Sequence, residues 1–358
     1  MNQIKTLLGV AFVILYNTAI AQKSEIFTTP LKDYNHAVAL YENSDYAAAQ
    51  VIFSNIEGDF DNDSETKANI AFYKAFAAVR LNQVGADNAM SDFVKNYPTS
   101  LKSAVAYLEI GNYYFSVAKY HNAIKWFAQV EMNRLSAVQK ETLQFNKGYS
   151  LFAIKKYKLA KIYFSSLLNS KEYSEKAMYY YGYIAYADKD YDNADKYLSQ
   201  VSTQKDYASN ISYYLADINF KMGRFKNAID IATSLLKNVQ GSQISHISKI
   251  IGESHFNLTN YTEAIPFLLA YKGEKGQWNN NDYYQLGYAY YMQKDYISAI
   301  SWFNKIVSGA DAVAQNASYH LADCYLKTVN KTAALNAFRK ASQMDFNTSI
   351  KEDAFYNY

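Results

Sequence analysis

The sequence contains few of the residues that build disulfides, metal clusters or tight turns. Its 358 residues include one cysteine, Cys324, which excludes an internal disulfide and a zinc site built on several thiolates. Only 3 prolines and 13 glycines are present, too few for an all-β chain with many tight turns. Basic and acidic residues nearly balance, at 36 and 33, and no block of Lys and Arg occurs. The sequence therefore predicts no nucleic-acid partner.

Apolar and aromatic residues are abundant by contrast. Hydrophobic residues make up 50% of the chain, enough for a substantial core, and 36 residues are tyrosine. A tyrosine can bury its ring while its hydroxyl stays near water. This composition suits an elongated fold with much half-buried surface.

The first 21 residues have the pattern of a secretory signal peptide. Lys5 precedes an apolar stretch from Leu7 to Tyr16, and Ala19-Ile20-Ala21 supplies the small-x-small pattern of a cleavage site. The alternative is an uncleaved anchor, but a membrane span needs roughly 20 apolar residues. No later segment is apolar enough to cross a membrane. We therefore expect an exported chain, periplasmic or associated with the outer membrane, with no membrane span after cleavage.

A small residue recurs along the chain at a nearly constant spacing. The successive intervals are 37, 34, 34, 36, 35 and 35 residues. The positions are Gly111, Gly148, Gly182, Ala216, Gly252, Gly287 and Ala322. A small residue at a fixed place in a helix allows a second helix to approach closely, so the spacing predicts a repeated pair of helices.

A second mark follows the first in register. An aromatic residue lies three positions before an alanine, and a bulky residue lies four positions after it in most repeats, which places all three on one helical face. The aromatic and alanine pairs are Tyr46/Ala49, Tyr120/Ala123, Tyr157/Ala160, Tyr191/Ala194, Phe225/Ala228, Tyr261/Ala264 and Tyr296/Ala299. The second repeat departs from this pattern, with Gly85-Ala86 at the turn, and the ninth has Lys331 in the aromatic position.

These marks resemble the tetratricopeptide repeat (TPR) family, and the resemblance covers residues 22–351. It implies an all-α fold, a right-handed superhelical solenoid of about nine helix-turn-helix repeats. The expected helix pairs are 30–63, 67–99, 104–137, 141–171, 175–206, 209–241, 245–276, 280–311 and 315–347. Residues 352–358 resemble the start of a further, truncated repeat helix. The chain also resembles the N-terminal regions of long exported bacterial TPR proteins.

The same resemblance implies a concave groove lined by the first helices. The residues expected there are Tyr149, Tyr183, Tyr288, Tyr179, Tyr186, Tyr213, Tyr284, Tyr291 and Tyr319. Tyr149, Tyr183 and Tyr288 are the strongest candidates, because the family usually has a short amide at their position. The alternative is that most of these rings pack one repeat on the next. Lys176 and Lys249 are isolated, so a cluster that grips a terminal carboxylate is not expected.

We predict a non-catalytic scaffold that binds a protein or peptide, with no cofactor and no metal. The five histidines are dispersed, Cys324 is expected to be a buried inert thiol, and no phosphate-binding loop or nucleophile motif occurs. One alternative is a recognition module of a longer protein whose further part carries an anchor or activity. A weaker alternative is a binder of glycan or peptidoglycan. Self-association through the C-terminal face, Ala337 to Tyr358, is also expected.

Overall fold

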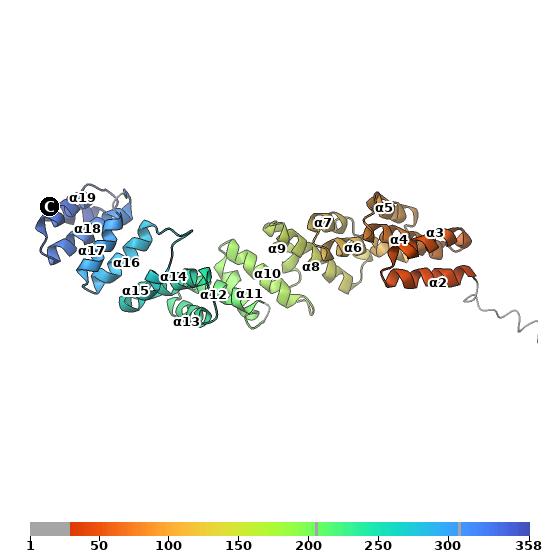
Figure 1. Cartoon of the computed structure of the whole chain (residues 1–358), viewed down its shortest axis with the longest axis horizontal. Coiled ribbons are helices and arrows are strands. Elements are labelled where there is room, and N and C mark those ends of the chain that lie inside the picture. Colours follow the sequence, from red (N-terminus) through yellow and green to blue (C-terminus); the bar gives the residue numbers. More distant parts are fainter. Residues whose placement is uncertain (1–28, 205–206, 307–308) are drawn as a thin grey trace, which may run out of the picture. The chain divides into compact units, whose positions relative to one another are not determined.

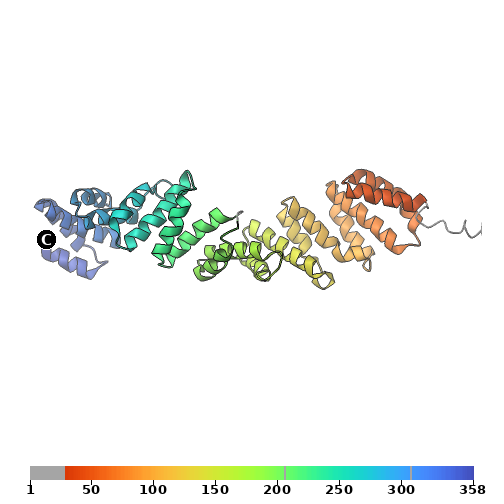
Figure 2. The same cartoon turned by 90° about the horizontal axis from the view of Figure 1, so that it is seen from below.

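The computed structural model describes residues 29–204, 207–306 and 309–358. The signal peptide predicted at residues 1–21 lies outside these ranges. The described residues form helices and no strand, with one isolated β-bridge between Glu274 and Gln277. The described residues divide into two compact units, unit 1 up to Tyr173 and unit 2 from Ser174 onward. Within each unit, antiparallel helical hairpins follow one another in chain order (Figures 1 and 2).

Unit 1 contains four hairpins. They are α2 (Thr29–Glu42) with α3 (Tyr46–Ile56), α4 (Ser64–Arg80) with α5 (Ala86–Asn96), α6 (Leu101–Ser116) with α7 (Tyr120–Phe127), and α8 (Ala137–Ala153) with α9 (Tyr157–Ser165). Short 3-10 helices, η2 (Glu57–Phe60) and η3 (Met132–Arg134), lie in two of the links.

Unit 2 contains five hairpins and one further helix. The hairpins are α10 (Ser174–Ala187) with α11 (Tyr191–Gln200), α12 (Ala208–Lys221) with α13 (Phe225–Leu236), α14 (Ser242–Asn257) with α15 (Tyr261–Ala270), α16 (Asn280–Met292) with α17 (Tyr296–Phe303), and α18 (Ala312–Lys327) with α19 (Lys331–Ser342). The 3-10 helix η4 (Asn304–Ile306) follows α17, and α20 (Thr348–Asn357) packs against α19. The nine predicted helix pairs and the all-α repeat fold are therefore confirmed.

Both sequence marks lie where the two helices of a hairpin meet. A Cβ built on Gly252 would lie 2.9 Å from the backbone nitrogen of Leu268, and one built on Gly287 would lie 2.8 Å from the ring of Phe303. The marker alanines of the second helices are fully buried, as are most of the bulky residues four positions later. Small residues thus bring the helices together, and large residues fill the space beside them.

In each hairpin, one residue in the left-handed backbone region follows shortly after the first helix. Eight of the nine are not glycine, although side chains disfavour this region. The residues and their φ angles are Ser44 (70°), Asn82 (57°), Ala118 (56°), Lys155 (62°), Lys189 (62°), Gly223 (72°), Thr259 (62°), Lys294 (62°) and Val329 (61°). The left-handed residue ends the first helix of the hairpin, and the chain then changes direction into the second helix.

The second hairpin differs from the others at its turn, where the sequence has Gly85-Ala86. Its turn is longer, with Asn82 and Gly85 both at positive φ before α5 begins at Ala86. Met90 is fully buried on α5, whereas Ala89 is only partly buried. Met90 and Phe93 are thus the buried residues along this part of α5, where the other second helices bury an alanine followed by a large residue.

Candidate partner-binding surface

The first helices of neighbouring hairpins contact one another within each unit. In unit 1, α2 contacts α4, α4 contacts α6, and α6 contacts α8. In unit 2, α12, α14, α16, α18 and α20 are in contact in the same way. These contacts give each unit a surface made of first-helix side chains, which we call the first-helix surface. The tyrosines predicted as site residues lie on these helices and are all half-buried.

Tyr149 on α8 packs against the preceding hairpin of unit 1. Its ring centroid is 5.6 Å from that of Phe115 and 5.7 Å from that of Tyr120, both in edge-to-face geometry. Such pairs stabilise a packing interface beyond the area that they bury. Tyr149 therefore links two hairpins while part of its ring stays at the surface.

Tyr288 on α16 occupies the same place in unit 2. Its ring lies 5.9 Å from both Phe256 and Tyr261 of the preceding hairpin. Tyr183 on α10 instead contacts Tyr214 of the following hairpin, at 5.5 Å. The three strongest candidates thus share a packing role between hairpins. This geometry agrees with the alternative interpretation given above, and part of each side chain stays exposed.

Acidic residues occupy the equivalent position in other repeats. Asp217 on α12 accepts a 2.8 Å hydrogen bond from the hydroxyl of Tyr186, and Asp323 on α18 accepts one of 2.9 Å from Tyr291. Each bond joins one hairpin to the next. The sequence predicted Tyr186 and Tyr291 on the surface but paired neither with an aspartate. Their separations of 31 and 32 residues, close to one repeat, are the signal that could have done so.

The surface tyrosines are held in their protonated form. Burial is the largest cause of the raised pKa of Tyr186. The negative charge of Asp217 and the hydrogen bond to it raise this pKa further. A hydrogen bond to Asp353, together with burial, raises the pKa of Tyr319 to about 12. Burial is also the main cause of the raised pKa of Tyr179, Tyr213 and Tyr284. Their hydroxyls are therefore hydrogen-bond donors at neutral pH.

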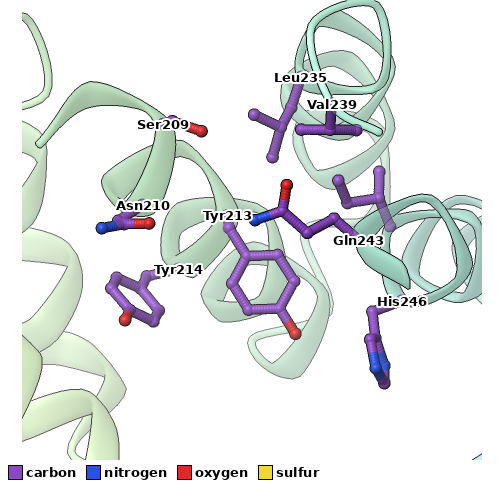
Figure 3. Close-up of a pocket in the computed structure, with 9 residues that line it drawn as sticks. Ser209, Asn210, Tyr213, Tyr214, Leu235, Val239, Gln243 and His246 are labelled. Carbon is purple, nitrogen blue, oxygen red and sulfur yellow. The ribbon is translucent and has the colours of Figure 1, made fainter. Parts of the chain in front are cut away.

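A small pocket of about 150 Å³ opens between α12 and α14 on this surface. Figure 3 shows Tyr213 in the gap, with Gln243 and His246 of α14 on the opposite side. Leu235 and Val239 close the apolar end. Ser209, Asn210, Gln243 and His246 are exposed, so the pocket offers an apolar wall with amide, hydroxyl and imidazole groups at its rim. Sequence reasoning named Tyr213 but missed the polar rim, which only the juxtaposition of two hairpins creates.

The lysine in this part of the surface is already paired. The ammonium of Lys249 lies 2.9 Å from Asp282 and 3.7 Å from Glu253, and it sits 4.4 Å from the ring centre of Tyr271. Burial raises the pKa of Glu253, and Lys249 opposes this rise. Lys249 is thus neutralised by two carboxylates, which disfavours the binding of a terminal carboxylate at this point.

Cys324 is completely buried, and burial raises the pKa of its thiol to about 12, as expected for an inert side chain. Across residues 29–204, 207–306 and 309–358, no group of three or more metal-ligating side chains is found. Among the same residues, no helix has the length and apolar character of a membrane span.

Comparisons with known proteins agree with the repeat pattern. Residues 176–204 match the tetratricopeptide repeat family model. No curated protein matches the sequence. The fold is similar to the C-terminal part of a TPR repeat-containing protein from Cytophaga hutchinsonii, at 15% identity and a TM-score of 0.47, covering 69% of this chain and 98% of the other.

Two further solved structures are similar. One is a tetratricopeptide repeat protein from Parabacteroides merdae, at 13% identity and a TM-score of 0.40, covering 70% of this chain and 96% of the other. The other is YrrB, described as a TPR protein with an unusual peptide-binding site, at 15% identity and a TM-score of 0.44, covering 54% of this chain and 97% of the other.

Proposed function

The chain is a tetratricopeptide repeat protein, and from this premise we propose that it is a non-catalytic scaffold that binds a protein or peptide on its first-helix surface. The observation that carries the proposal is the pocket at Tyr213. It combines an aromatic ring, an apolar wall and exposed polar groups from two successive hairpins. Pockets of this kind accept a side chain of a bound segment, while rim groups bond its backbone.

The half-buried tyrosines extend this binding surface through unit 2. Tyr213, Tyr284 and Tyr319 each have a ring fixed by packing or by a hydrogen bond to a neighbour. A ring fixed before binding loses little conformational freedom when a partner arrives. Tyrosine also combines an apolar face with a hydroxyl donor. A surface of this type suits an extended or helical segment that makes contact with several successive hairpins.

Site-specific photocrosslinking in living cells tests the proposal. A photoreactive residue replaces Asn210 or Gln243, which are exposed at the pocket rim, so neither change disturbs the core. The matched control replaces Lys226, an exposed residue on α13 that does not line the pocket. We expect the same crosslinked protein from Asn210 and Gln243 and none from Lys226. Crosslinks from Lys226 alone would place the partner on the second helices and overturn the proposal.

A second comparison tests the three tyrosines predicted to contact the partner. Tyr149, Tyr183 and Tyr288 are all changed to alanine, and the circular dichroism of the variant is compared with that of the unaltered chain. Because these rings also pack between hairpins, some loss of stability is expected. Loss of the crosslinked partner with retained helix content would assign the rings to binding. Retention of the partner would assign them to packing alone.

We also propose that the protein works in the bacterial cell envelope after export. The support is the signal-peptide pattern of residues 1–21. Cell fractionation of the full chain and of a chain lacking residues 2–21 tests this location. The full chain is expected in the periplasmic or outer-membrane fraction, and the shortened chain in the cytoplasm. Equal cytoplasmic retention of both would contradict the proposal.

Self-association through the C-terminal face is a further proposal for the isolated chain. On α20, the side chains of Phe355 and Tyr356 are 71% and 88% exposed. Large apolar groups exposed side by side favour association. Light scattering at increasing concentration should detect dimers, and changing both residues to serine should abolish them. A monomer at every concentration would disprove this proposal.

A further inference from the structure

A second aromatic site lies between the link 271–279 and α17. The rings of Trp278 and Trp302 are 5.4 Å apart with an interplanar angle of 24°, and Tyr283 is 5.5 Å from Trp278. These rings border an open cleft of about 590 Å³ between the link 271–279 and α17. Ligand pockets typically measure about 300 to 1,000 Å³. The cleft therefore has the size of a binding site.

The cleft is formed before any ligand arrives. Trp278 donates a 2.9 Å hydrogen bond from its indole Nε1 to the carbonyl of Tyr271, and the backbone nitrogen of Lys272 donates one of 2.9 Å to Ser245 Oγ. A turn between them is closed by a 3.0 Å bond from the nitrogen of Gln277 to the carbonyl of Glu274. Gly273, at a φ of 84°, leaves no room for a side chain beside Gln277. These tethers fix the position of the Trp278 ring.

The charged groups of the cleft are of one sign. Lys272 and Lys305 line it, and both are exposed. The ammonium of Lys305 lies 3.8 Å from the ring centre of Trp302. Within the described ranges, neither ammonium is in an ion pair. The cleft thus presents two positive charges beside an indole pair, with no carboxylate paired to either charge.

The corresponding place in unit 1 shows how the site differs from ordinary packing. There Trp126 lies 5.7 Å from Tyr107, and the ammonium of Lys125 lies 5.3 Å from the ring centre of Trp126. Lys125, however, is paired with Asp87 at 3.3 Å, and Trp126 is 3% exposed. In unit 1 the tryptophan is therefore buried and the lysine beside it is paired with a carboxylate, whereas in unit 2 Trp302 is partly exposed and Lys305 has no ion pair among the described residues.

We propose that this cleft binds an acidic peptide segment that carries an aromatic side chain. Its carboxylates would pair with Lys272 and Lys305, and its aromatic ring would pack on Trp278 and Trp302. A neutral sugar fits less well, because sugar hydroxyls call for dense amide and carboxylate groups, and the lining supplies one amide, Gln277. The site goes beyond the proposed function, since the link 271–279 and α17 supply its two indoles, and Tyr283 is the one lining residue that comes from a first helix.

Fluorescence anisotropy with the full mature chain tests this site. The probe is fluorescein-labelled Glu-Glu-Phe-Glu-Glu, compared with the same peptide carrying glutamine or lysine in place of glutamate. The test variant combines Lys272→Glu with Lys305→Glu, both at exposed positions. The matched control is Lys125→Glu in unit 1. We expect the acidic peptide alone to bind, the test variant to weaken binding about tenfold or more, and the control to leave it unchanged.

Three results would overturn the inference. They are equal binding of the acidic and glutamine peptides, unchanged binding by the test variant, and binding of an acidic oligosaccharide such as tetragalacturonate in place of the peptide. The crosslinks from Asn210 and Gln243 provide an independent readout. They should persist in the test variant, so failure of this site and failure of the proposed function are distinguishable.

Discussion

The hydroxyl of Tyr186 on α10 donates a 2.8 Å hydrogen bond to Asp217 on α12, which joins two successive hairpins of unit 2. Tyr291 and Asp323 repeat the relationship between two later hairpins. The half-buried aspartate gains a donor, and the buried hydroxyl gains a charged acceptor. The interface between hairpins therefore depends on a polar bond as well as on ring packing.

Tyr186→Phe removes this donor and keeps the ring. We expect the free energy of unfolding to fall by about 1 to 2 kcal/mol, because Asp217 stays half-buried without its partner. Urea unfolding followed by circular dichroism measures the change. Tyr356→Phe is the control, since its side chain is 88% exposed, and it should leave the midpoint unchanged. Equal midpoints for Tyr186→Phe and the unaltered chain would show that the bond contributes nothing to stability.

Val329→Gly should stabilise the protein by about 1 kcal/mol. Val329 has a φ of 61°, a conformation that costs a β-branched residue about 1 to 2 kcal/mol, and its side chain is 80% exposed, so little packing is lost. The reverse change, Gly223→Val, is the matched control at the same turn position of another hairpin. It should lower the melting temperature. A drop for both variants would contradict the strain argument.

Gly252→Ala should destabilise unit 2 by about 1 to 3 kcal/mol. The added methyl group would lie 2.9 Å from a backbone nitrogen of Leu268, which cannot move without shifting α15. Gly58→Ala is the control, because nothing lies within 4 Å of a Cβ built there. Thermal unfolding of both variants checks the prediction. Equal melting temperatures for the two variants would contradict it.

Acid should weaken the aromatic cluster around His320. Burial lowers the pKa of His320 from 6.5 to about 4, and Asp323 only partly opposes this shift. Its ring lies 5.1 Å from Tyr288 and from Tyr291. In the unfolded chain, His320 takes up a proton below pH 6.5, whereas in the folded chain it does so only near pH 4. The contribution of neutral His320 to the free energy of unfolding is complete above pH 6.5. It falls by about 2 to 3 kcal/mol as the pH drops toward 4.

Denaturation at pH 7 and pH 4.5 measures this loss. Carboxylates also titrate in the same range, so the unaltered chain is compared with His320→Leu. The variant should lose less stability between the two pH values. His36→Gln, at an exposed position, should behave like the unaltered chain. An identical pH dependence for His320→Leu would remove His320 as the cause.

The repeat architecture could be predicted from the sequence because each repeat encodes the same close contacts. Gly252 and Ala264 have fixed places on their helices, and the nine pairs follow from those spacings. The site was less predictable. Whether Tyr288 faces a partner or the preceding hairpin depends on the rotation between hairpins, which no local pattern records. The cleft at Trp278 depends on hydrogen bonds within the link 271–279, which the repeat spacing does not record.

The position of the tyrosine bonds has a mechanical consequence. Within a hairpin, the two helices meet through glycine and alanine contacts, whereas α10 and α12 are joined by the bond of Tyr186 to Asp217 and by the contacts of Tyr183 and Tyr186 with the ring of Tyr214. A pulling force applied along unit 2 would thus act on a directional hydrogen bond and on ring packing together at such a junction. Tyr186 and Tyr291 would resist the separation of successive hairpins through both their hydroxyls and their rings.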